Sequence, residues 1–292
     1  MGKSNKIVPQ SMCNWLLMMV FLMQFVVSLF AKNIWEIISY KPLEQHYYIL
    51  IVEVFAVALP MFLLCTFNKS GFVKTFCIKK IKFSKVRKCV CLGICLQPVA
   101  VVANYVWQIV LDIESQTTYS VVPSDAKNFI IIFLCTCIVP AFCEEFLLRG
   151  MYLSSVKRKG YGFAISASTI MFVLMHSDVS LLMAHAILGI ATAFVVLNTN
   201  SVFSGILLHV SFNLGGIFTD VIAKNFEGFG DFGVHVLIGV AGLFLSLLLI
   251  KRLGIKKSKT AGTKEFAKNL FKALFNLPIL VIIIIYIYRI VG

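Results

Sequence analysis

Charge is scarce in this 292-residue sequence: only 14% of the residues are charged, and 13 acidic residues stand against 27 lysines and arginines. Soluble domains carry about 25% charged and about 45–50% apolar residues, so the composition excludes an ordinary globular protein. Hydrophobic residues make up 59% of the chain and occur in continuous rather than alternating runs. This pattern also excludes a disordered chain, a collagen and a porin-type barrel.

Several common signatures are also lacking. The sequence has no internal repeat, no low-complexity linker and no recognisable soluble domain. It has no CxxC motif, and its nine cysteines lie mostly within apolar runs, which favours small buried residues over a disulfide scaffold. The zinc-protease motif HExxH is absent. No small-residue cleavage site follows the first apolar run, so we expect an uncleaved anchor there.

Long apolar runs are what the sequence has in abundance. A transmembrane helix needs about 20 apolar residues, so eight or nine spans would use the whole hydrophobic content. We predict an all-α, polytopic transmembrane helical bundle of about eight or nine spans, with residues 1–292 forming a single integral membrane domain. The last span could instead be re-entrant or interfacial. The predicted spans are 15–31, 47–65, 89–111, 128–148, 161–176, 179–198, 202–221, 234–250 and 273–291.

The net charge of +14 is segregated by loop. Segments 69–88, 149–159 and 251–272 hold eight, four and eight basic residues with a single acid among them, whereas segment 112–127 holds three acids and one lysine. If the N-terminus is cytoplasmic, all three basic segments fall on the cytoplasmic side, as the positive-inside rule requires. We therefore predict a multi-pass protein of the cell membrane whose basic loops orient it and contact anionic lipid. Nucleic-acid binding is not expected.

Ionisable and amide side chains inside the predicted spans are candidates for function, because charges in lipid are costly. Glu145 and Arg149 are one helical turn apart and can pair on one face, which is a sufficient structural explanation for both. Glu144 points about 100° away from that face. For Glu53 and His185, a buried contact between helices and a role in a cavity both stay open. The remaining candidates are His176, His209 and Asn213.

Spacing places these groups at similar depth. Phe172 and His176 are one turn apart, as are His209 and Asn213, so each pair shares a helix face. If the fourth helix continues to residue 157, Glu144 and His176 lie about 20 and 24 Å from the cytoplasmic boundary, and the other pair about 12–18 Å. We predict one water-accessible cavity near mid-membrane. A separation above about 8 Å between His176 and both Glu144 and His209 would be too wide for a shared water.

Three motifs stand in order: EExxxR at 144–149, FxxxH at 172–176 and HxxxN at 209–213. In these residues the sequence resembles the CPBP family of intramembrane proteases, which comprises type II CAAX prenyl endopeptidases and bacteriocin-processing relatives. The resemblance covers roughly residues 128–216, which we expect to form the catalytic core. It implies an intramembrane endopeptidase that hydrolyses a peptide bond of a membrane-associated protein or peptide, such as a CAAX-type prenylated protein or a leader peptide.

Two assignments of the chemistry stay open, and the favoured one requires no cofactor. In that assignment Glu144 is the general base, and His176 helps to hold the attacking water. His209 and Asn213 donate hydrogen bonds to the developing oxyanion. The supporting residues are Glu145, Arg149 and Phe172.

In the second assignment Glu144, His176 and His209 ligate Zn²⁺, whose bound water attacks while Glu145 acts as the base. Two non-proteolytic functions also compete. One is a bacteriocin immunity or scaffold protein of the same family, and the other is a transporter with a proton relay of buried glutamate and histidine. No inverted repeat supports a transporter.

Overall fold

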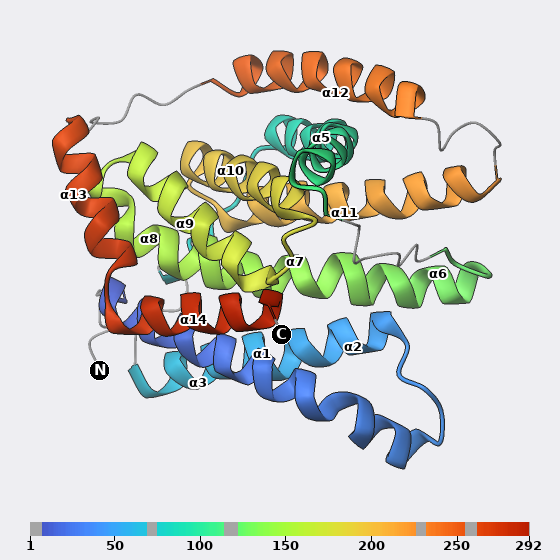
Figure 1. The fold of residues 1–292 in the computed structure, drawn as a ribbon. Coiled ribbons are helices and arrows are strands. Elements are labelled where there is room, and N and C mark those ends of the chain that lie inside the picture. The colour runs from blue at the N-terminus through green and yellow to red at the C-terminus, as the bar shows by residue number, and fades with distance from the viewer. Residues whose placement is uncertain (1–7, 69–74, 114–121, 226–231, 255–261, 292) are drawn as a thin grey trace.

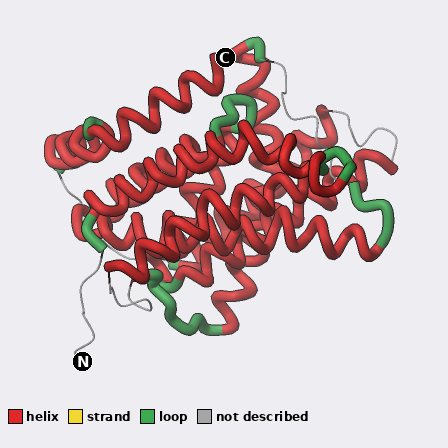
Figure 2. Tube along the Cα trace, turned by 90° about the horizontal axis from the view of Figure 1, so that it is seen from below, coloured by secondary structure: helices red, strands yellow, loops and turns green. Residues whose placement is uncertain are grey.

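The computed structural model describes residues 8–68, 75–113, 122–225, 232–254 and 262–291, and within these ranges the chain forms helices and their connections without any strand. Figures 1 and 2 show most of the helices running side by side as one bundle. Their bounds are α1 (Gln10–Ser39), α2 (Gln45–Ile51), α3 (Leu59–Asn68), α5 (Phe83–Leu111), α6 (Ala126–Ile132), α7 (Val139–Glu145), α8 (Leu153–Val156), α9 (Tyr161–His176), α10 (Leu182–Thr199), α11 (Val202–Asn225), α12 (Phe232–Leu253), α13 (Thr263–Leu274) and α14 (Leu277–Val291).

By length and composition, seven of the described helices can cross a membrane, or eight if α13 and α14 count as one bent span. The prediction of an all-α, polytopic helical bundle is therefore confirmed, at seven or eight spans where eight or nine were expected. The seven are Gln10–Ser39, Gln45–Phe67, Phe83–Leu111, Ala126–Lys159, Leu182–Thr199, Val202–Ile222 and Gly233–Leu253.

Two predicted spans differ in the structure. The span expected at 161–176 is α9, which has only 16 residues and is too short to count as a full span. The span expected at 273–291 is α14, and the preceding basic segment contains α13, which meets it at an angle of 70°. Asn276 separates the two helices: its Nδ2 donates to Ala273 O at 2.8 Å, and the following Pro278 cannot extend the earlier helix because it lacks an N–H.

The fourth span is the longest. Ala126–Lys159 is one helix of 34 residues, so it continues past Arg149 as the depth argument requires. Two stretches of it, Phe133–Ile138 and Phe146–Tyr152, are π-helical, as is Val52–Ala58 in the second span. Such π-turns are rare and occur frequently at functional sites. All three lie next to the polar residues singled out from the sequence.

The predicted alternation of loops agrees with which segments lie together. At one end of the bundle, Val202 N donates to Cys77 O at 3.1 Å, and Lys157 Nζ lies 3.6 Å from Cys77 Sγ. At the other end, Trp107 Nε1 donates to Val179 O at 3.0 Å. We call the first the basic end, because it gathers the described parts of the three lysine- and arginine-rich segments. That this end faces the cytoplasm stays a prediction.

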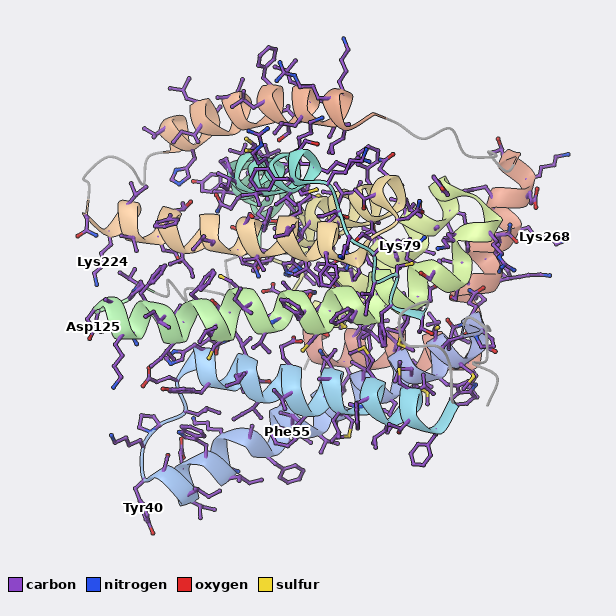
Figure 3. All side chains as sticks on the ribbon, turned by 180° about the vertical axis from the view of Figure 1, so that it is seen from behind. Tyr40, Phe55, Lys79, Asp125, Lys224 and Lys268 are labelled. Carbon is purple, nitrogen blue, oxygen red and sulfur yellow. The ribbon has the colours of Figure 1, made fainter. Side chains whose placement is uncertain are left out.

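Figure 3 follows the same division of the molecule. Lys268, on α13, lies at the basic end, whereas Tyr40, Asp125 and Lys224 lie at the opposite end. In Figure 1, α13 stands across the basic end, at a steep angle to most of the other helices. The long helices therefore have two chemically different ends, and the site lies between them.

Candidate functional site

Glu145 forms the centre of a buried polar cluster. Its Oε1 lies 3.1 Å from Arg149 Nη1 and 3.2 Å from His209 Nδ1, so the ion pair expected along the helix is present and has a second basic neighbour. Arg149 is fully buried; its Nη2 donates to Gly189 O at 3.2 Å, and its guanidinium lies 4.4 Å from the centre of the Phe172 ring. A buried charge is tolerated when it is paired and hydrogen-bonded, which accounts for the depth of Arg149.

Gly205 makes room for this cluster. It lies on α11 one turn before His209, and a Cβ added there would stand 2.6 Å from Glu145 Oε2 and 2.9 Å from Val196 Cγ2. The absence of a side chain lets α11 approach the carboxylate closely. The position therefore sets the distance between the two histidine- and glutamate-bearing helices.

Glu144 faces a different histidine. Its Oε1 lies 3.7 Å from His176 Nε2, well inside the limit of about 8 Å set for a shared water. His176 Nδ1 lies 2.8 Å from Phe172 O, and because a carbonyl can only accept, Nδ1 carries the proton. The neutral ring therefore presents the lone pair of Nε2 toward Glu144. The His176 side chain is 23% exposed, so water can reach this pair.

The Phe172 ring is surrounded by three imidazoles. Its centre lies 4.6 Å from that of His176, 5.8 Å from that of His209 and 6.2 Å from that of His185. His185 stacks on His176 with ring centres 3.8 Å apart. The sequence left the role of His185 open; the structure places it against the histidine that faces Glu144. No motif signals this contact, because it depends on how α9 and α10 pack.

Asn213 is held by a carbonyl that a proline sets free. Pro140 has no N–H, so the carbonyl of Thr136, four residues earlier in the same helix, loses its usual helical donor. Asn213 Nδ2 donates to this Thr136 O at 3.0 Å. A carboxamide nitrogen has two N–H groups. One is therefore used to join α11 to the fourth span, and the other is left for a ligand.

These side chains meet at a cavity of about 440 Å³ inside the bundle. All four predicted catalytic residues line it, whereas the supporting Glu145, Arg149 and Phe172 lie behind its wall. Part of the wall comes from the first two spans. The polar lining residues are Gln24, Gln45, Tyr48, Glu53, Thr136, Glu144, His176, Asp178, His185, His209 and Asn213.

Glu53 is a second residue whose role the sequence left open. It is buried in the π-helical stretch of the second span, and its carboxyl lies within interaction distance of the Glu144 carboxyl and the Cys143 thiol. Two carboxyl groups can hydrogen-bond to one another only when they share a proton. The cavity thus brings together two acids from different helices, which is a suitable arrangement for proton transfer.

The described side chains do not form the zinc site that the second assignment requires. Within the described ranges, no group of three or more His, Cys, Asp or Glu side chains is arranged to hold a metal ion. Glu144 and His176 face each other, but His209 turns its Nδ1 to Glu145. These donors fit a hydrogen-bonded network rather than a metal centre in this conformation.

Comparison with known protein families adds one match. Residues 126–215 match the family model described as Type II CAAX prenyl endopeptidase Rce1-like. The matched region contains the EExxxR, FxxxH and HxxxN motifs, so the resemblance found in the sequence is confirmed. No curated protein and no solved structure matches the chain.

Proposed function

From the premise that residues 126–215 form a region of the type II CAAX prenyl endopeptidase kind, within the CPBP family of intramembrane proteases, we propose that this multi-pass membrane protein is an endopeptidase. It hydrolyses a peptide bond of a membrane-associated protein or peptide in the cell membrane. The observation that carries the proposal is the 3.7 Å pairing of Glu144 with His176 at a cavity that His209 and Asn213 also line.

The catalytic step begins with a water held by Glu144 and His176 Nε2. Glu144 takes a proton from this water as its oxygen attacks the carbonyl carbon of the scissile bond. The proton then passes to the leaving nitrogen as the C–N bond breaks. One water is consumed, and a carboxyl and an amine are produced. His176 is oriented for this task by its Nδ1 bond to Phe172 O.

His209 and Asn213 stabilise the oxyanion formed in the same step. Glu145 lies behind His209 Nδ1, so it fixes the orientation of the ring and favours its protonated form, which presents Nε2–H to the cavity. Asn213 supplies the N–H that is not bonded to Thr136 O. We assign no step to a metal, because the described residues do not assemble its ligands.

Comparative peptidomics of cell membranes tests the proposal. Cells carrying the wild-type chain should contain peptide fragments that are missing from cells carrying Glu144→Gln. Glu265→Gln is the matched control, because Glu265 is an exposed glutamate on α13, remote from the cavity lining. Identical peptide profiles for wild type and Glu144→Gln, with the cellular phenotype kept, would favour a non-proteolytic immunity or scaffold protein instead.

A further inference from the structure

We infer that the cavity opens toward the end of the bundle opposite the basic end, so that it receives a neutral or cationic peptide segment from the non-cytoplasmic side of the membrane. The inference rests on the proposed function for the word peptide. Its direction and charge preference rest on the geometry of the cavity alone.

The first support is the length of the helices. The α9–α10 hairpin has helices of 16 and 18 residues, or about 24 and 27 Å, whereas α5 and α11 have 29 and 24 residues, or about 44 and 36 Å. At the basic end the hairpin is level with its neighbours, because Ser201, next to the end of α10, donates to Lys79 O. At the other end its turn at 177–181 is therefore recessed (Figure 1).

The second support is which residues line the cavity and which close it. Gln45, the first residue of α2, and Leu181, in the recessed turn, line the same cavity as Glu144. None of its lining residues comes from the segments that gather at the basic end. On that side the fully buried Arg149 and Phe172 form a floor, since each lies one turn nearer to the basic end than the glutamates and His176.

The third support is the charge of the lining. Glu53, Glu144 and Asp178 line the cavity, and no lysine or arginine does so. A cleft lined by one sign of charge concentrates ligands of the opposite sign. A peptide recognised through a free terminal carboxylate would lie among acids without a cationic partner. A neutral segment, or one carrying lysine or arginine, fits this lining.

The membrane side follows from the distribution of basic residues. The end that bears segments 69–88, 149–159 and 251–272 is the one that the positive-inside rule assigns to the cytoplasm. The recessed turn contacts the far end of α5, where Gln108 Nε2 donates to Ser180 O at 3.1 Å. That end of α5 leads into the acidic segment 112–127. The mouth of the cavity therefore faces the non-cytoplasmic side.

Single-cysteine labelling of the full chain in intact cells tests the direction, with the nine native cysteines replaced. Gln45→Cys and Leu181→Cys should react with a membrane-impermeant maleimide added outside, whereas Lys80→Cys, an exposed position at the basic end, should react only after permeabilisation. Reaction of the two mouth positions only after permeabilisation, or in neither state, would overturn the inference. Labelling needs no catalysis, so it should be unchanged by Glu144→Gln and separates this inference from the proposed function.

Reaction rates at Ala184→Cys, deeper in the same cavity, test the charge preference. A cationic trimethylammonium-ethyl methanethiosulfonate should react at least about ten-fold faster than the anionic sulfonatoethyl reagent. The ratio should fall in Asp178→Asn, which keeps the oxygen that accepts from Ser180 N and Leu181 N. Equal rates, or a faster anionic reagent, would contradict an acidic, carboxylate-excluding cavity.

Discussion

Glu145 and His209, 64 residues apart in the chain, are joined inside the bundle by a contact of 3.2 Å between Oε1 and Nδ1. The same carboxylate oxygen lies 3.1 Å from Arg149 Nη1. One buried oxygen therefore links the fourth span to α11 and sets the orientation of a histidine that lines the cavity. A residue expected only to support its helix is thus also a positioning residue for the oxyanion donor.

Replacing Glu144 by Gln should lower the rate of peptide hydrolysis by about 10²–10⁴-fold, because the general base is lost while the shape is kept. The rate is measured in proteoliposomes, on a substrate identified by peptidomics, and the melting temperature in detergent should stay close to wild type. Retained hydrolysis by Glu144→Gln would remove Glu144 from the mechanism.

Replacing Glu145 by Ala should destabilise the fold by about 3–5 kcal/mol, because it leaves the buried Arg149 without its partner. Thermal unfolding of the detergent-solubilised protein measures this loss.

The double variant Glu145→Gln/Arg149→Met separates stability from positioning. Without either charge it should recover most of the melting temperature, yet its turnover should stay low because His209 loses the carboxylate behind Nδ1. Full recovery of turnover would mean that Glu145 acts only through Arg149.

Gly205→Ala should destabilise the protein by about 1–3 kcal/mol and lower its activity, because the new Cβ forces Glu145 Oε2 out of its place. Gly162→Ala is the matched control: it is a helical glycine with no atom within 4 Å of the added Cβ. Alanine there should leave activity unchanged and raise stability by about 0.5–1 kcal/mol. Equal effects of the two changes on activity would argue against crowding at the glutamate.

Asn213→Ala should lower the turnover number by about 10²-fold, which is milder than the loss for Glu144→Gln, because His209 remains as an oxyanion donor. Steady-state kinetics should show the change in kcat rather than in KM, since the donated hydrogen bond strengthens in the transition state. A change confined to KM would instead indicate that Asn213 binds the ground state of the substrate.

Hydrolysis should persist after treatment with 1,10-phenanthroline and extensive dialysis, because the favoured assignment uses no metal. The zinc content of the purified protein, measured by mass spectrometry, should not correlate with activity. Inactivation by the chelator followed by recovery on adding Zn²⁺ would favour the second assignment, with Glu144, His176 and His209 rearranged into ligands.

Sequence reasoning recovered what depends on one helix at a time. Hydropathy located the spans, and one-turn spacing paired Glu145 with Arg149 and placed Phe172 beside His176. The bend before α14 also has a local signal that was not used, since Asn276 and Pro278 are residues typical of a helix boundary.

The relationships that sequence reasoning missed all involve how one helix is rotated against another. The stacking of His185 on His176, the contact of Glu53 with Glu144 and the pairing of Glu145 with His209 join different helices. Apolar periodicity is weak in helices that are hydrophobic all round, so it cannot fix these rotations.

The walls of the cavity come from two parts of the chain with different histories of constraint. The groups that break the bond lie within residues 126–215, whereas Gln24, Gln45 and Glu53 belong to spans outside the matched region. Mutations in the first two spans can therefore change which peptide is accepted while the hydrolytic chemistry is kept. Two homologues with identical motifs can then differ in their targets, and their N-terminal helices are where that divergence should be sought.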